Sequence, residues 1–133
     1  MNLNYISPSD LMLGDWVRYK TSKSPHKIFS YKELDGNLTL SFEPLPLTEE
    51  ILEKNGFMKW SWYKCGQINV VITYSIGEGF NLELKEDGSF WLVDNVRDDG
   101  DYGYESNYIC DVKYVHELQH ILKILKIKKE IIL

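Results

Sequence analysis

The chain has 133 residues, of which 44% are hydrophobic and 26% are charged, and its formal net charge is −5. A chain of this length fits one domain and buries about two-thirds of its unfolded surface without help from metal or disulfides. No apolar run approaches the roughly 18 residues needed to cross a bilayer. Cys65 and Cys110 lie far apart and outside any C-x-x-C pair, which excludes a disulfide framework. The first eleven residues lack the features of a signal peptide, so we expect a soluble cytoplasmic protein with no membrane contact.

The charges are unevenly distributed along the chain. Residues 1–33 carry a net charge of +2, residues 34–110 carry −9, and residues 111–133 carry +2. An acidic middle repels a phosphate backbone, which a nucleic-acid-binding protein usually meets with a basic face. The charge pattern therefore disfavours a nucleic-acid partner.

Residues 1–43 are predicted to form a small curled sheet. Gly14-Asp15 predicts a tight turn before the first strand. Residues 27–31 are predicted to return as a second strand, and a hairpin turn at residues 35–37 to lead into a third strand at residues 38–42. Three short strands after a Gly-Asp turn are similar in pattern to an SH3-like sheet, an analogy that does not fix function.

Residues 44–57 are predicted to form a linker and a short helix. Pro44 and Pro46 remove backbone donors, which favours an extended connection. Thr48 is a favoured N-cap for the segment that follows, and the glutamates of that segment suit the positive end of a helix. Gly56 falls where a helix commonly ends in a left-handed residue.

Residues 58–113 alternate apolar and polar side chains with a period of two, which is typical of an antiparallel sheet with one exposed face. The polar, glycine-containing stretch Asp94–Ser106 is predicted to be a loop, and Tyr108–Lys113 to be a short final strand. Before that loop we predict a meander of four strands, at residues 60–63, 68–74, 80–84 and 90–93.

Residues 114–130 are predicted to form a C-terminal helix that covers one face of this sheet. Val115, Leu118 and Leu122 recur at the spacing of one helix face. The whole chain is therefore predicted to be a single α+β domain, residues 1–133, in which an antiparallel sheet is covered by one short and one long helix.

The segment HELQH at residues 116–120 matches H-E-x-x-H, the helical signature of zinc metallopeptidases. In such enzymes two histidines one turn apart bind Zn²⁺, and the glutamate takes a proton from the bound water. His116 and His120 have the ligand spacing, and Glu117 occupies the place of the general base. A third ligand is not indicated, because lysines stand where the metzincin motif continues with glycine and histidine.

The geometry of the helix favours a structural role for this segment. At about 100° per residue, the apolar residues fall in an arc roughly 120° wide, and His116 and His120 fall near the opposite side. We expect the apolar arc to contact the sheet and the histidines to face solvent or the edge of a groove. We therefore predict no metal, no cofactor and no catalytic residue. The alternative is a zinc-dependent hydrolase with His116 and His120 as ligands and Glu117 as base.

Three segments of the chain carry a resemblance to a known family. They are LGDWV at residues 13–17, PLPLTEEILEKNGF at residues 44–57 and YVHELQ at residues 114–119. Together they resemble a family of small uncharacterised proteins from Bacteroides-type bacteria, associated with prophages and other mobile elements. The resemblance spans nearly the full length and implies a bacterial origin and a shared fold. It implies no activity, ligand or catalytic residue.

Aromatic residues make up 14% of the chain and supply the candidate contact residues. Tyr102, Tyr104 and Tyr108 lie in or beside a polar, glycine-containing stretch, a composition typical of adaptable interfaces. Trp60 and Trp62 are expected to share one strand face, where we favour the aromatic core of a twisted sheet. If they were exposed and contiguous, a contact surface would be the better interpretation.

The sequence thus favours a non-enzymatic binding protein with a protein partner, in a phage or mobile-element context. The competing class is the zinc-dependent hydrolase. The oligomeric state is left open.

Overall fold

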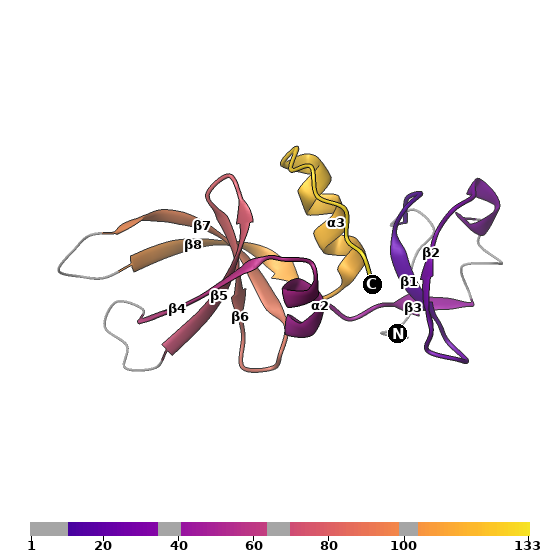
Figure 1. The fold of residues 1–133 in the computed structure, drawn as a ribbon, viewed down its shortest axis with the longest axis horizontal. Coiled ribbons are helices and arrows are strands. Elements are labelled where there is room, and N and C mark those ends of the chain that lie inside the picture. Colours follow the sequence, from indigo (N-terminus) through magenta and orange to yellow (C-terminus); the bar gives the residue numbers. More distant parts are fainter. Residues whose placement is uncertain (1–10, 35–40, 64–69, 99–103) are drawn as a thin grey trace.

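The protein consists of two antiparallel sheets with a helix between them (Figure 1). The computed structural model describes residues 11–34, 41–63, 70–98 and 104–133. One sheet has three strands in the order β2-β1-β3, and the other has five in the order β4-β5-β6-β7-β8. Helix α3 (Val115–Ile124) lies between the sheets, and the shorter helix α2 (Glu49–Lys54) shares a hydrophobic core with it. This arrangement agrees with the predicted α+β class.

The smaller sheet is built around strand β1 (Trp16–Tyr19), which pairs with β2 (Pro25–Lys27) and with β3 (Phe42–Pro44). The predicted second strand at residues 27–31 is wrong. The chain leaves β2 at Lys27 and forms the 3-10 helix η2 (Tyr31–Leu34).

Glu33 explains why the second strand is short. Its Oε2 accepts hydrogen bonds from Phe29 N–H at 2.7 Å and from Ser30 N–H at 3.1 Å, and its Oε1 contacts His26 Nε2. These bonds close the backbone into a turn. Of the described residues in the predicted third strand, Phe42 lies in β3 and Ser41 lies in the turn before it. Residues 38–40 and the predicted hairpin turn at residues 35–37 lie outside the described residues.

The residues predicted as a linker pair with the start of α3. Leu47 N–H donates to the Lys113 carbonyl at 2.9 Å, and Val115 N–H donates to the Leu45 carbonyl at 2.9 Å. Pro44 belongs to strand β3, which tolerates proline because it lies at the edge of its sheet. The connection between the two sheets is therefore fixed by backbone pairing.

Helix α2 confirms the predicted capping residues. Thr48 Oγ1 accepts a hydrogen bond from Ile51 N–H at 3.3 Å. At the other end Gly56 has a φ of 78°, and Phe57 N–H donates to the Leu52 carbonyl at 3.1 Å, as in a Schellman motif. Glycine adopts this left-handed conformation without steric strain, and the ending brings Leu52 and Phe57 into the core.

The larger sheet confirms the predicted meander but has longer final strands. Strands β7 and β8 run Phe90–Asp98 and Tyr104–Val112, so most of the predicted loop at residues 94–106 is paired strand. Their register shifts twice, between Leu92 and Val93 and between Asn95 and Arg97. Such bulges interrupt the alternation by which a strand is identified in a sequence. The preceding strands are β4 (Met58–Tyr63), β5 (Val70–Gly77) and β6 (Phe80–Leu84).

Helix α3 is shorter than the predicted helix of residues 114–130. It ends at Ile124, because the chain forms a second Schellman motif there. Ile127 N–H donates to the Leu122 carbonyl at 2.8 Å, and Lys126 between them has a φ of 58°. The residues that follow return toward β1 (Figure 1).

The main hydrophobic core lies between the larger sheet, α2 and α3, and it includes Ile131 from the C-terminal end. A second cluster fills the smaller sheet and consists of Leu11, Val17, Ile28 and Phe42. Among the described residues, no helix has both the length and the apolar character required to cross a bilayer.

Candidate functional site

The HELQH segment lies on α3 with its polar side against the smaller sheet. His116 is 7% exposed, and the side chain of His120 is 26% exposed. The prediction that both histidines face solvent or a groove edge is therefore wrong for His116. The apolar arc of α3 packs on the larger sheet, and the opposite side, which carries His120, bonds to the turn before β1.

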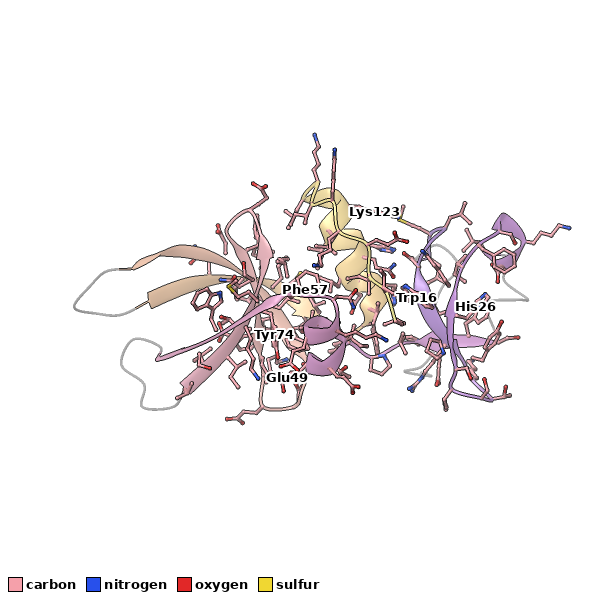
Figure 2. All side chains as sticks on the ribbon, in the orientation of Figure 1. Trp16, His26, Glu49, Phe57, Tyr74 and Lys123 are labelled. Carbon is pink, nitrogen blue, oxygen red and sulfur yellow. The ribbon has the colours of Figure 1, made fainter. Side chains whose placement is uncertain are left out.

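Gln119 joins α3 to the turn before β1 through both ends of its amide. Its Nε2 donates to the Gly14 carbonyl at 2.9 Å, and its Oε1 accepts from Trp16 N–H at 2.8 Å. The indole Nε1 of Trp16 donates to the Ile131 carbonyl at 2.8 Å. Figure 2 shows Trp16 between the smaller sheet and α3. This side of α3 therefore connects the two sheets.

Asp15 lies fully buried beside His120. Its Oδ2 accepts from Met12 N–H at 2.8 Å and lies 2.6 Å from His120 Nε2. Its Oδ1 has no hydrogen-bond partner among the described residues. The ring of His116 lies 5.7 Å from that of His120, measured between centroids. Asp15 thus adds to the histidine pair a carboxylate that the sequence did not indicate.

This cluster differs from a metallopeptidase site in two respects. The 2.6 Å separation of His120 Nε2 and Asp15 Oδ2 is a direct hydrogen bond, which leaves no space for an ion between them. Glu117 Oε1 accepts from Lys113 N–H at 2.9 Å and from Tyr114 N–H at 3.0 Å, so its carboxylate caps the helix. Within the described residues, no three His, Cys, Asp or Glu side chains are arranged to hold a metal.

The larger sheet has a second face, turned away from α2 and α3, that carries exposed aromatic side chains. Trp60 on the edge strand β4 is 55% exposed, and Tyr108 on the opposite edge strand β8 is 58% exposed. Residues directly opposite each other in an antiparallel pair share one face. We call this surface the outer face. Cross-strand pairing defines it as two rows of residues. The first row is Met58, Ser75, Asn81, Val93 and Tyr108. The second row is Trp60, Thr73, Glu83, Trp91 and Asp111.

The centre of the outer face is buried although both helices pack on the other side of the sheet. Thr73, Asn81, Glu83 and Val93 are all buried, and none of them belongs to either hydrophobic cluster. The outer face therefore combines exposed apolar edges with a buried and largely polar floor.

The aromatic rings at the β8 edge are held by neighbouring side chains. The rings of Trp91 and Tyr108 meet edge to face at 5.5 Å, and Lys85 Nζ lies 5.2 Å from the centroid of Trp91. Tyr108 Oη donates to Asp111 Oδ1 at 3.4 Å. Desolvation, and then Asp111, raises the pKa of Tyr108. Rings oriented in advance lose less conformational entropy on binding.

Two of the five predicted contact residues have described side chains. Trp60 and Tyr108 lie at opposite edges of the outer face, and the exposure of Trp60 overturns our preference for an aromatic core. Trp62 lies in strand β4 and Tyr104 in strand β8, but the structure does not describe their side chains. Tyr102 lies outside the described residues. Met58, two positions before Trp60, lies on the outer face by the same alternation but was not among the predicted contact residues.

A cleft of about 470 Å³ lies between α3, the C-terminal residues and the turn before β1. Its basic lining residues are Lys27, Lys123, Lys128 and Lys129. Lys27 Nζ lies 2.6 Å from Glu130 Oε1, and Lys129 Nζ lies 4.7 Å from the ring centroid of Phe57. Because these two lysines already have partners within the fold, the cleft is a weaker candidate than the outer face.

The three sequence segments that carry the family resemblance meet in space around α3. Residues 13–17 contact Gln119 and His120, and residues 45–47 pair with residues 113–115. Comparison with protein-family models, with curated proteins and with solved structures returned no match for this chain. The family resemblance therefore stays a prediction, and the function is inferred from the geometry of the described residues.

Proposed function

We propose that the protein is a non-enzymatic binding domain that recognises a partner protein through the outer face. The observation that carries this proposal is the combination of exposed aromatic edges and a buried polar floor on one sheet face. An antiparallel sheet normally exposes polar side chains on its uncovered face. Trp, Tyr and Met are instead enriched in protein interfaces, and Trp and Tyr often dominate the binding energy.

The partner surface is expected to be basic and partly apolar. Residues 34–110 carry a net charge of −9, and the outer face itself carries the exposed Asp111. Complementary charge accelerates association and disfavours wrong partners, whereas the same charge repels a nucleic-acid backbone. The aliphatic stems and charged heads of lysine and arginine would also pack on the exposed rings.

A display library of protein fragments tests this proposal, because the selection itself identifies the fragments that bind. Selected fragments should be rich in basic residues and should lose about tenfold or more in affinity for Trp60→Ala or Tyr108→Ala. The matched control is Phe29→Ala, because Phe29 is also exposed but follows strand β2 of the smaller sheet. Fragments that bind all of these proteins equally would rule out the outer face as the site. A library that yields no ligand would count against a binding role.

We further propose that the protein acts in the cytoplasm, in a phage or mobile-element context. The family resemblance supports the context. Cys110 is a free thiol whose pKa is raised by burial and then by Glu117 and Asp111, which suits an unreactive cysteine of a reducing compartment. Cell fractionation checks the location, and recovery from the periplasm or from membranes would contradict it.

A zinc-dependent hydrolase is the second candidate, because His116 is buried beside His120 and Asp15. Metal binding would require His120 to exchange its hydrogen bond with Asp15 for a bond to the ion. Protein purified without an affinity tag should then contain about one zinc per chain, as in known catalytic sites, and His116→Ala should lose it. Zinc well below one equivalent in the unsubstituted protein would exclude the hydrolase.

A further inference from the structure

We propose that strand β4 pairs with β4 of a second copy of this chain, joining the two larger sheets across a two-fold axis. Strand β4 forms one edge of its sheet, and the four consecutive residues Met58 to Ser61 are all exposed. It pairs with β5 over its whole length without a register shift. A regular edge strand of this kind presents unpaired N–H and C=O groups to any strand that can align with it.

The two edges of the sheet differ in the features that prevent such pairing. Strand β8, at the other edge, contains a bulge at Ile109, where its register with β7 shifts, and it carries the exposed Asp111. Bulges and charges are common devices by which proteins block an edge. Strand β4 contains no proline, and its one charged residue, Lys59, turns toward α2, where its Nζ lies 3.5 Å from both Glu49 Oε1 and Glu53 Oε1. Of the two edges, the β4 edge is therefore the one open to pairing.

The sequence of β4 is complementary to itself, which makes a second copy the occupant. An antiparallel arrangement centred on Trp60 sets Trp60 opposite Trp60 of the partner subunit and Lys59 opposite Ser61 of the partner subunit. No like charges face each other in this register, and an aromatic pair forms at the centre. Such a contact is isologous, with the same residues used by both copies, as in most homodimers.

A two-fold axis perpendicular to the sheet keeps both outer faces on the same side. The dimer therefore presents one continuous outer face, while α2 of each copy lies on the opposite side.

Analytical ultracentrifugation over micromolar to millimolar concentrations tests this inference on the protein alone. We expect an apparent mass that rises toward twice that of the chain. Trp60→Lys should be monomeric, because it sets two positive charges opposite each other. Tyr108→Lys, at the other edge, should reach the same apparent mass as the unsubstituted protein. A monomer at every concentration would overturn the inference, as would a dimer that Trp60→Lys leaves intact.

Substitutions at Ser61 test the register and do not depend on Trp60. Ser61→Glu should lower the Kd of the dimer about three- to tenfold, because it forms two opposite-charge pairs with Lys59, and Ser61→Lys should raise it by a similar factor. Equal effects of the two substitutions would overturn the proposed register. Circular dichroism shows whether each variant is folded. These outcomes do not involve the partner protein, so failure of this inference is distinguishable from failure of the proposed function.

Discussion

The carboxylate of Asp15 is buried where two segments far apart in the sequence meet. Its Oδ2 is shared between Met12 N–H and His120 Nε2, so it fixes the turn before β1 and joins that turn to α3. A buried carboxylate without its partner is costly, because it has lost its hydration and gains nothing in return. The two side chains should therefore be strongly coupled.

A double-mutant cycle on Asp15 and His120 measures this coupling. Asp15→Ala is expected to lower the free energy of unfolding by about 3 kcal/mol, since it leaves both Met12 N–H and His120 without their partner. His120→Ala is expected to lower it by about 2 kcal/mol, since the buried carboxylate keeps only its bond from Met12. The double variant should lose less than the sum of the two, because only one interaction is removed. Urea denaturation of the four proteins provides the values. Additive losses would mean that the hydrogen bond contributes nothing of its own.

Glu43 should make the protein sensitive to acid. The hydrogen bond from Lys23 Nζ at 2.5 Å lowers the pKa of Glu43 against the opposing effect of burial, and Arg18 Nε at 2.6 Å adds to the lowering. The folded-state pKa therefore lies below the ordinary value of about 4.3. The stabilisation is present in full above that ordinary value and is lost as the pH falls through the folded-state pKa.

The unsubstituted protein should consequently lose stability more steeply than Glu43→Gln below about pH 4. Unfolding followed by circular dichroism at a series of pH values supplies the comparison. Glu130→Gln is a suitable control, because Glu130 also pairs with a lysine but is exposed. Parallel acid profiles for the unsubstituted protein and Glu43→Gln would contradict the assignment.

At the scale of elements, the end of α3 is decided by a single strained residue. The apolar periodicity continues to Leu125, yet Lys126 adopts a left-handed conformation and closes the Schellman motif. Glycine is the usual residue at this position because a side chain is disfavoured there by roughly 1–2 kcal/mol. The fold accepts this strain because the turn directs Ile131 into the core.

Lys126→Gly should therefore stabilise the protein. The relief of strain exceeds the entropy that glycine loses on folding, which leaves a gain of about 0.5–1 kcal/mol. Thermal unfolding should show a higher Tm than that of Lys128→Gly, the matched control, since Lys128 does not have a positive φ. A Tm unchanged or lowered by Lys126→Gly would show that the lysine side chain makes a compensating contact.

At the scale of the whole molecule, polar contacts between described residues link the two sheets. Gln119 bonds to Gly14 and Trp16, and the indole of Trp16 bonds to the Ile131 carbonyl. The side-chain amide of Asn55 bonds to both backbone groups of Ile132. The C-terminal residues are therefore a part of the contact between the sheets.

Gln119→Ala should uncouple the smaller sheet from the rest of the molecule. It leaves Gly14 O and Trp16 N–H without their amide partner, at a cost of about 2 kcal/mol. In hydrogen exchange, the amides of β1 and β3 should lose protection while those of β5 and β6 keep theirs. Lys123→Ala, an exposed change on the same helix, is the control. Uniform loss of protection across both sheets would mean that they unfold as one unit.

The features that the sequence predicted correctly depend on local physical chemistry. Thr48 and Gly56 marked the ends of α2 because hydrogen bonding by a cap and the conformational freedom of glycine act within a few residues. The alternation of apolar and polar side chains predicted the strands of the larger sheet, because successive residues of a strand point to a buried and to a less buried face. Where bulges broke the alternation in β7 and β8, the prediction became a loop.

The tertiary structure decided which surfaces are covered. The pattern of α3 identified its apolar arc, but the bond of His120 to Asp15 depends on a turn about one hundred residues earlier in the chain. In the same way, the composition of β4 was compatible with a core or a surface, and the exposure of Trp60 follows from the position of β4 at the edge of the sheet. The sequence by itself determined local structure and the segments that must be buried. Only the packing of distant segments determined that His120 bonds to Asp15 and that Trp60 is exposed.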